Sequence, residues 1–178
     1  MDVDAIINKF YDDNAEGKAI LVVHSKLVTE IALEMAERHP ELNIDAVFVS
    51  EAAMLHDIGI YLCSAPSIGC YGSEPYIKHG VLGAELLRRE GFERHARVCE
   101  RHTGTGLSKE SILAQELPLP IQDFLPETIE EKLICFADKF FSKSRPSERK
   151  SVEEARKSIS KFGIESLQRF DEWCELFL

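Results

Sequence analysis

The sequence predicts an all-α fold, and three observations support this prediction. Apolar residues recur at steps of three and four over long segments, as expected for one face of a helix. Capping-box patterns that start helices occur at residues 128–131 and 151–154. Alternation with a period of two, which indicates strands, does not extend over any useful length. The 178 residues contain no internal repeat or low-complexity tract, so we expect a single domain.

The N-terminal part of the chain predicts a short helix followed by a long one. Residues 3–12 form the short helix, and the long one covers residues 17–38 until Pro40 ends it. A stripe of apolar residues runs along the long helix at Ile20, Leu27, Val28, Ile31 and Met35. His24 falls on this stripe and is therefore expected among core positions.

The third predicted helix ends in a histidine and an aspartate, just before a glycine. Either Asn43 or Asp45 can cap its N-terminus. Its apolar stripe leads to His56, and Asp57 lies about 100° further round the helix, so that both side chains can reach one ion. An imidazole and a carboxylate that point inward must pair, accept hydrogen bonds or bind a metal.

Irregular and helical segments alternate in the rest of the chain. Residues 59–77 are rich in glycine, proline and tyrosine, and a loop of this length in a compact domain is usually functional or disordered. His79 begins the next predicted helix and His102 ends the one after it. Further helices are predicted at residues 108–116, 128–141, 151–161 and 164–177.

The C-terminal part of the chain contains a carboxylate at a core position and a last helix with an apolar face. Asp138 is a carboxylate inside an apolar helical run, which is costly unless it is paired or binds an ion. The last helix has an apolar face with Trp173 and Phe177, which packs either internally or at the interface of a homodimer. We expect residues 151–178 to pack on a core formed by residues 20–145.

Composition limits the function classes. A formal net charge of −10 disfavours binding of duplex nucleic acid, and an anionic substrate would need a local source of positive charge. The five cysteines are odd in number and include no C-x-x-C pair, which indicates free thiols in a reducing compartment. The acidic N-terminus does not resemble a signal peptide, and no apolar run approaches the roughly 20 residues of a membrane span. We therefore expect a cytoplasmic protein.

Polar residues on core-facing helix positions form one candidate site: His24, His56, Asp57, His79, His102 and Asp138. A single inward histidine is more often a satisfied core residue than a ligand. Four histidines and two carboxylates are harder to satisfy by hydrogen bonds alone. Imidazole with carboxylate is a ligand mix that suits Zn, Mn, Ni or Fe, whereas no cysteine pair has the spacing of a thiolate site.

The order H…HD…H…H…D, with His-Asp-Ile-Gly at its centre, resembles the HD superfamily of metal-dependent phosphohydrolases, in particular its HDIG-type members. The resemblance covers residues 20–145. The segments at residues 78–84, 101–104 and 136–139 are similar to those that flank the same ligands in the bacterial dinucleoside tetraphosphate hydrolases and in a small HDIG group.

This resemblance implies a helical bundle with a metal site between its helices. The primary metal would be held by His24, His56, Asp57 and Asp138. In the six-ligand branch His79 and His102 hold a second metal that Asp57 bridges, and mononuclear members lack these histidines or use them on substrate. We expect two divalent transition-metal ions, of Fe, Mn, Ni, Co or Zn.

The implied reaction is hydrolysis of a phosphoester or phosphoanhydride bond by metal-activated water. The expected substrate is a small phosphorylated compound, a nucleotide or a dinucleoside polyphosphate. Asp57 and Lys139 are the predicted catalytic residues. Substrate phosphate contacts are predicted first for Lys139 and then for Arg145, Lys109 and Thr103, although a solvated surface position is the more common fate of such residues.

Two other functions fit the same ligands. A few members of the superfamily use this ligand set as a di-iron oxygenase, and a non-catalytic nucleotide-binding module would also keep it. The tyrosines of the 59–77 loop either stack on a base or cover the core, and the sequence does not choose between these roles.

Overall fold

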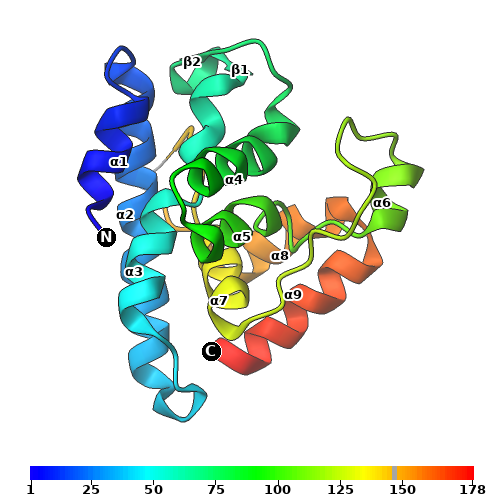
Figure 1. Ribbon diagram of the computed structural model, residues 1–178. Coiled ribbons are helices and arrows are strands. Elements are labelled where there is room, and N and C mark those ends of the chain that lie inside the picture. The colour runs from blue at the N-terminus through cyan, green and yellow to red at the C-terminus, as the bar shows by residue number, and fades with distance from the viewer. Residues whose placement is uncertain (146–147) are drawn as a thin grey trace.

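A computed structural model describes residues 1–145 and 148–178 as a bundle of helices (Figure 1). The all-α prediction is confirmed, with one very small sheet beside the helices. The α-helices are α1 (Val3–Phe10), α2 (Ala15–Arg38), α3 (Ala46–Leu55), α4 (His79–Arg89), α5 (Glu93–Arg101), α6 (Lys109–Ala114), α7 (Ile129–Asp138), α8 (Val152–Ile159) and α9 (Ile164–Phe177). The sheet pairs β1 (Ser64–Ala65) with β2 (Cys70–Tyr71) in antiparallel orientation.

Short 3₁₀ turns join several of these elements. They are η1 (Pro40–Leu42), η2 (Ile58–Leu62), η3 (Pro66–Ile68), η4 (Tyr76–Lys78) and η5 (Ser160–Phe162). Three of these turns and the β1–β2 hairpin fall in or next to the 59–77 segment, which the sequence predicted as an irregular loop. The segment therefore has local structure, but no element in it is longer than a few residues.

Side-chain caps fix the starts of several helices, among them α2, α3 and α7, whereas α4 and α5 have no side-chain cap. Asp45 rather than Asn43 caps α3, because its carboxylate accepts a hydrogen bond from the Phe48 amide at 3.0 Å. Asn43 instead adopts a left-handed conformation with φ of 49°. The capping box at Ser151 is complete, with both reciprocal hydrogen bonds present.

The capping box predicted at Thr128 is only half formed. The Thr128 hydroxyl accepts from the amide of Glu131 at 3.2 Å, as predicted. The Glu131 carboxylate does not return this bond, since it accepts from the amide of Glu127 and pairs with Arg97 and Arg101. The prediction of a full box was wrong because these arginines hold the Glu131 carboxylate.

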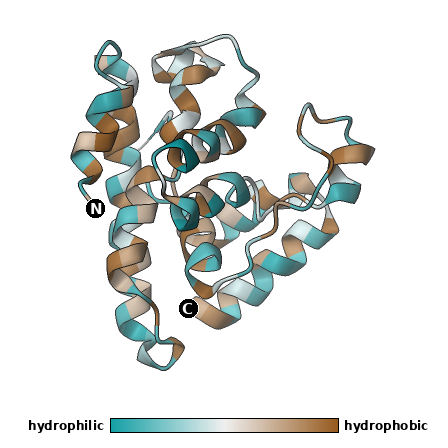
Figure 2. Cartoon of the chain, in the orientation of Figure 1, coloured by the Kyte–Doolittle hydropathy of each residue, from teal (hydrophilic) through white to brown (hydrophobic). Residues whose placement is uncertain are grey.

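Two large hydrophobic clusters hold most of the helices together. One joins α2, α3, α5, α7, α8 and α9, and includes Phe136, Phe170 and Phe177. The other joins α1, α2, α3, η2, α4 and α5, and includes Leu21 and Leu55. Individual helices carry both hydrophobic and hydrophilic residues, as expected for surface helices of a bundle (Figure 2). Since α2 and α3 contribute to both clusters, the ligands that they carry lie where the clusters meet.

The C-terminal helices α8 and α9 contribute to the first hydrophobic cluster. Trp173 and Phe177 are buried there, so the apolar face of α9 packs internally. Ile164 at the start of the helix is exposed. Helix α7 ends at Asp138, three residues earlier than predicted, and the chain then turns.

A close crossing positions the His-Asp-Ile-Gly segment against α4. A Cβ atom added to Gly59 would lie 2.3 Å from the carbonyl oxygen of His79 and 2.4 Å from the amide nitrogen of Gly83. Such distances are shorter than any side chain tolerates, so only glycine lets η2 approach α4 this closely. The crossing brings Asp57, which precedes η2, next to His79.

The cysteines and the apolar character of the helices were used above to predict the environment of the chain. The five cysteines are free thiols, and Cys174 alone among them is not fully buried. Within the described residues, no helix combines the length and the apolar character needed to cross a membrane.

Candidate metal centre

Four buried side chains converge from three helices to form the first part of the centre. His24 comes from the middle of α2, His56 and Asp57 follow the end of α3, and Asp138 is the last residue of α7. One ligand atom from each of the four residues lies within 4.8 Å of the others. The closest pairs are His24 Nε2 with Asp138 Oδ1 at 2.9 Å and His56 Nε2 with Asp57 Oδ2 at 3.0 Å.

A second group shares Asp57 with the first. The other carboxylate oxygen of Asp57, Oδ1, lies 3.4 Å from His79 Nε2 and 3.3 Å from His102 Nε2. The two Nε2 atoms are 3.1 Å apart. Each oxygen of Asp57 therefore faces one group, which is the arrangement of a carboxylate that bridges two sites.

Backbone carbonyls orient three of the four histidines. His56, His79 and His102 each place Nδ1 beside the carbonyl oxygen three residues earlier, at 2.6, 2.7 and 2.7 Å respectively. A carbonyl oxygen can only accept, so Nδ1 carries the proton and donates. In the neutral ring Nε2 is then the unprotonated nitrogen, and it points into the centre, as it does in histidine ligands whose other nitrogen donates to a carbonyl oxygen.

The centre contains buried polar atoms that the described residues leave without hydrogen bonds. These are His56 Nε2 and Asp57 Oδ1, whereas Asp57 Oδ2 is paired with the Lys143 ammonium. Unsatisfied polar atoms in a fully buried position cost free energy, and a cation would satisfy both of them. Nitrogen and oxygen donors in this mixture suit a divalent transition metal, so the residues present fit such an ion.

Burial and charge act in opposite directions on the groups of the centre. Burial lowers the pKa of His79 to about 3 and also lowers the pKa of His102. At His56, burial lowers the pKa, but the carboxylates of Asp57 and Asp138 outweigh it and raise the pKa to about 9. His79 and His102 are therefore neutral at physiological pH, as ligands must be.

Two lysines neutralise the carboxylates. Lys143 Nζ lies 2.6 Å from Asp57 Oδ2, and Lys139 Nζ lies 2.6 Å from Asp138 Oδ2. Lys139 also donates to the carbonyl oxygen of His102 at 2.9 Å. Burial would raise the pKa of both aspartates, but these ammonium groups and the neighbouring histidines hold it well below its ordinary value.

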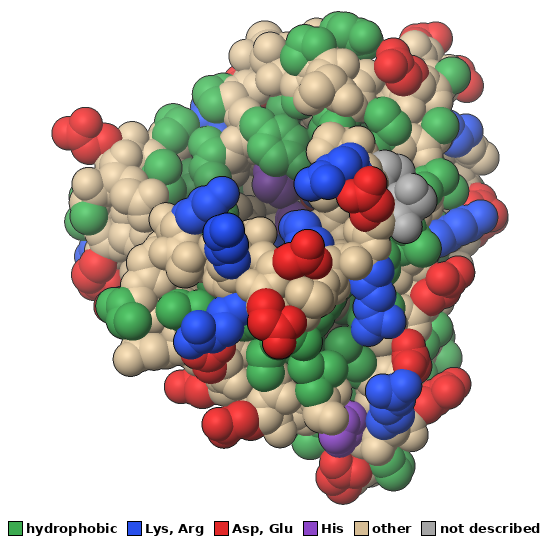
Figure 3. Space-filling model, turned by 180° about the vertical axis from the view of Figure 1, so that it is seen from behind, with side chains coloured by type: hydrophobic (Ala, Val, Ile, Leu, Met, Phe, Trp, Pro, Cys, Tyr) green, Lys and Arg blue, Asp and Glu red, His purple; other side chains and the backbone are tan. Residues whose placement is uncertain are grey.

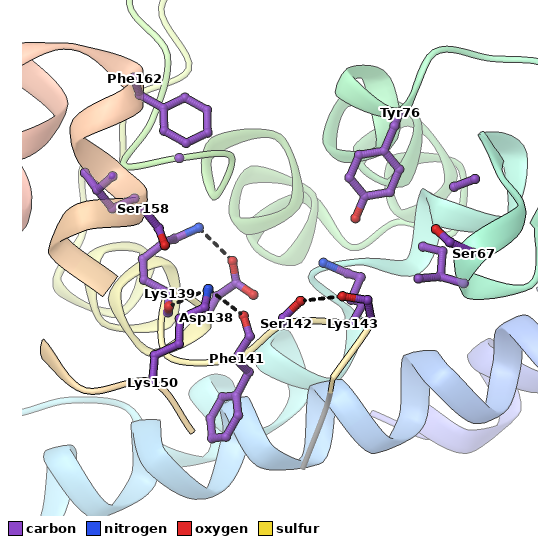
Figure 4. Close-up of a pocket in the computed structure, with 15 residues that line it drawn as sticks. Ser67, Tyr76, Asp138, Lys139, Phe141, Ser142, Lys143, Lys150, Ser158 and Phe162 are labelled. Carbon is purple, nitrogen blue, oxygen red and sulfur yellow. Dashed lines mark hydrogen bonds and ion pairs between the residues drawn. The ribbon is translucent and has the colours of Figure 1, made fainter. Parts of the chain in front are cut away.

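A cavity of about 550 Å³ opens beside the centre, and Asp138 is part of its wall. Histidine side chains are visible at the bottom of a hollow on this face, with lysine or arginine side chains around it (Figure 3). The ammonium groups of Lys139, Lys143 and Lys150 line the cavity. In the close-up, Tyr76 and Phe162 lie on opposite sides of it (Figure 4).

The structure brings the six predicted ligands together but separates the predicted phosphate contacts. Lys139 lines the cavity, whereas Arg145, Lys109 and Thr103 do not line it in the described part of the chain. Arg145 pairs with Glu148 on the surface at 2.9 Å. Lys109 is exposed at the start of α6.

The sequence also left open or missed several residues of this region. Tyr76 stacks on His79, with ring centroids 4.7 Å apart, whereas Tyr61 packs on Tyr11 in the core. Tyr61 therefore covers the core, whereas Tyr76 lies beside His79 and lines the cavity. Lys150 and Phe162 carried no signal, because neither lies near a ligand in the sequence.

Comparisons with known proteins were made for the whole chain. A family model described as "HD domain" matches residues 21–142. The chain is 34% identical over 145 residues to a tRNA (cytidine(56)-2'-O)-methyltransferase of Picrophilus torridus, covering 81% of this chain and 37% of that protein. No solved structure matches the chain.

Two further relatives were found among the archaea. An uncharacterised protein of Methanocaldococcus jannaschii is 40% identical over 121 residues, covering 66% of this chain and 64% of that protein. A tRNA (cytidine(56)-2'-O)-methyltransferase of Thermoplasma volcanium is 37% identical over 123 residues, covering 68% of this chain and 32% of that protein. The chain thus spans less than two thirds of each of these three relatives.

Proposed function

The chain belongs to the HD domain family, as its sequence pattern predicted, and on this premise we propose that it is a metal-dependent phosphohydrolase. The proposed reaction is hydrolysis of a phosphoester or phosphoanhydride bond in a small phosphorylated compound of the nucleotide class. One observation carries the proposal: the two ligand groups that share Asp57 lie beside a cavity lined by lysines.

We propose that both ligand groups hold divalent transition-metal ions. The first would be held by His24, His56, Asp57 and Asp138, and the second by Asp57 with His79 and His102. When bound, such ions supply positive charge to phosphoryl oxygens and lower the pKa of a water molecule to about 7. The donor set does not select among Fe, Mn, Ni, Co and Zn.

The lysines give this acidic protein the local positive charge that a phosphate needs. Among the described residues that line the cavity, Asp138 is the only acidic one, while Lys139, Lys143 and Lys150 are basic. The formal net charge of the chain is −10, so this excess of cations is local. We assign the lysines to the binding of phosphoryl oxygens, with Lys139 held in place by its contacts to Asp138 and His102.

Asp57 has two proposed roles, and its surroundings favour one of them. Its carboxylate is fully buried, and Lys143 and His56 keep its pKa well below the ordinary value despite that burial. A carboxylate with a depressed pKa is a permanent anion, which suits a metal ligand. Acceptance of a proton from the nucleophile stays a prediction.

The names of two relatives point to a different reaction, methyl transfer to tRNA. The matched segments cover only 37% and 32% of those proteins. We propose that methyl transfer belongs to the part of them that this chain does not match. A di-iron oxygenase or a nucleotide-binding module remains the alternative function of the same ligands.

The proposal is tested by purifying the protein without chelator and measuring phosphate release. The substrates would be nucleoside mono-, di- and triphosphates, dinucleoside tetraphosphates and simple phosphate monoesters, each with added Mn, Ni, Co, Zn or Fe(II). We expect a chelator to abolish phosphate release, and His56→Ala to reduce its rate by at least about 100-fold. Removing a group that only supports a metal ligand already costs about 10- to 100-fold, and His56 would itself be a ligand.

The matched control is His95→Ala, which changes a buried histidine that contacts Glu51 outside the centre. This variant should keep the wild-type rate. Metal binding without phosphate release from any compound would contradict the proposal. Iron with a mixed-valence signal and oxygen consumption would favour the oxygenase instead.

A further inference from the structure

The cavity beside the metal centre is bounded by aromatic rings on two sides, and these rings have no role in holding a metal. Tyr76 and Phe162 both line the cavity and are 37% and 39% exposed. Large apolar side chains are usually more deeply buried, so two part-exposed rings that line one cavity are available to a ligand. In Figure 4 they lie on opposite sides of the cavity, and the lysines lie below them in this view.

Each ring is held in place by its own support. The Tyr76 ring stacks on the His79 imidazole with an angle of 21° between the planes. The Phe162 ring lies over Gly104, where an added Cβ atom would be 3.5 Å from Cδ1 of the ring. Gly104 has a φ of 61°, which favours glycine, so the backbone beside His102 stays bare under the ring.

Phe162 comes from a part of the chain outside the family match. The match ends at residue 142, whereas Phe162 ends η5, the turn between α8 and α9. The metal ligands all lie within the matched segment. The C-terminal helices therefore add a wall to a cavity whose reactive side is built by the family segment.

We propose that Tyr76 and Phe162 form a ring-binding site that makes a nucleoside monophosphate the substrate. This inference rests on the proposed phosphohydrolase function and names its substrate class. The lysines would bind the phosphate and the two rings would contact the base, since every base offers a flat face to an aromatic side chain.

The size of the cavity supports a mononucleotide over a dinucleoside polyphosphate. Its volume of about 550 Å³ falls within the range of sites for single small molecules. A dinucleoside tetraphosphate carries a second nucleoside and three more phosphates, while the cavity has one group of lysines and one pair of part-exposed rings in the described part of the chain. Of the two substrates that the sequence resemblance implies, we therefore propose the nucleotide.

The test compares Phe162→Ala and Phe162→Trp with the wild type on nucleoside monophosphates and on glycerol phosphate, which has no ring. We expect Phe162→Ala to raise KM for nucleoside monophosphates about tenfold, the size of effect given by losing one stacked base. Phe162→Trp should keep the wild-type KM, because its side chain retains an aromatic ring. The inhibition constant of inorganic phosphate should be the same in all three proteins, because phosphate contacts only the lysines.

Ile164→Ala is the matched control, since Ile164 is 68% exposed, two residues further along, and does not line the cavity. Equal effects of Phe162→Ala and Ile164→Ala on KM would overturn the inference. So would an equal rise in KM for glycerol phosphate, or a higher kcat/KM for dinucleoside tetraphosphates than for nucleoside monophosphates.

Failure of the proposed hydrolase function would be recognised separately. If no phosphate compound is hydrolysed, calorimetric titration with nucleoside monophosphates and with inorganic phosphate still tests the rings. Weaker nucleotide binding by Phe162→Ala with unchanged phosphate binding would support the ring-binding site. Equal nucleotide binding by the variant and the wild type, or no nucleotide binding at all, would overturn it.

Discussion

Lys143 Nζ lies 2.6 Å from Asp57 Oδ2, the carboxylate oxygen that faces His24 and His56. The ammonium group thus contacts the same oxygen that a metal in the first ligand group would use. Lys143 also lines the cavity, so the one side chain reaches both the ligands and the substrate space. A metal ion in the first ligand group would therefore compete with the Lys143 ammonium for this oxygen of Asp57.

The first prediction concerns Lys143→Met. In chelator-treated protein the variant should lose about 3 kcal/mol of unfolding free energy, because the buried Asp57 carboxylate loses its cationic partner. Its affinity for Mn²⁺ should rise, since no ammonium group has to leave Asp57. Urea unfolding with and without Mn²⁺ measures the stability, and calorimetric titration measures the affinity.

Lys150→Met provides the control for this experiment. Lys150 lines the same cavity, but among the described residues its Nζ contacts only the backbone carbonyls of Lys139 and Phe141, both at 3.4 Å. This variant should change metal affinity little. The prediction is refuted if Lys143→Met is no less stable than Lys150→Met in chelator, or if it binds Mn²⁺ more weakly than the wild type.

The second prediction separates the two ligand groups. Elemental analysis of the wild type should give about two metal ions per chain, as in two-metal hydrolytic sites. His79→Ala should lower this to about one, because it removes a ligand from the second group only. His56→Ala should remove the ion of the first group, and His95→Ala should keep the wild-type content. Equal metal content in His79→Ala and the wild type would exclude His79 as a ligand.

The six candidate ligands could be singled out in the sequence because each combines a polar side chain with a core position. His24 lies on the apolar stripe of α2, and Asp138 interrupts the apolar run of α7. Periodicity along single helices gives such positions without knowledge of how the helices pack. The helix starts were also predictable where a Ser, Thr or Asp side chain caps the first turn, as at Ser151 and Asp45.

The side chains that line the cavity could not be predicted in the same way. Lys143 reaches Asp57 because α7 ends at Asp138 and the chain then turns, whereas the sequence predicted three more helical residues. Tyr76 and Phe162 lie in short 3₁₀ turns, where no periodicity assigns a side chain to a face. Their position depends on tertiary packing, which a single sequence does not encode in any local pattern.

The third prediction concerns the glycine of the His-Asp-Ile-Gly segment. Gly59→Ala should cost about 3 kcal/mol, because the new Cβ atom would collide with backbone atoms of His79 and Gly83 and force η2 away from α4. That shift would also separate Asp57 from His79, so metal content should fall. Urea unfolding and elemental analysis measure the two effects.

Gly91→Ala is the comparison for the steric effect. No heavy atom lies within 4 Å of the added Cβ at Gly91, but its φ of 86° is unfavourable for alanine. We expect a loss of about 1 kcal/mol from this backbone strain, with unchanged metal content. Similar stability and metal content in the two variants would show that the η2–α4 crossing does not need a glycine.

The last prediction concerns the pH dependence of the cap on α3, the helix that leads to His56. The hydrogen bond from the Phe48 amide is the main cause that lowers the pKa of Asp45, and Arg94 adds to it. A carboxyl whose pKa is lower in the folded state contributes stability that is fully present above its unfolded pKa of about 3.9. This contribution is lost as the pH falls through the folded pKa.

Asp45→Asn and Asp45→Ala separate the charge from the cap. Asparagine caps a helix about as well as aspartate but does not titrate, so the wild type should be more stable than Asp45→Asn at pH 7 and lose that advantage below about pH 4. Asp45→Ala removes the cap and should cost about 1 kcal/mol at pH 7. Urea unfolding at pH 7 and at pH 3 measures these differences in stability. A gap between the wild type and Asp45→Asn that stays constant from pH 7 to pH 3 would mean that the Asp45 carboxylate does not stabilise α3 through its charge.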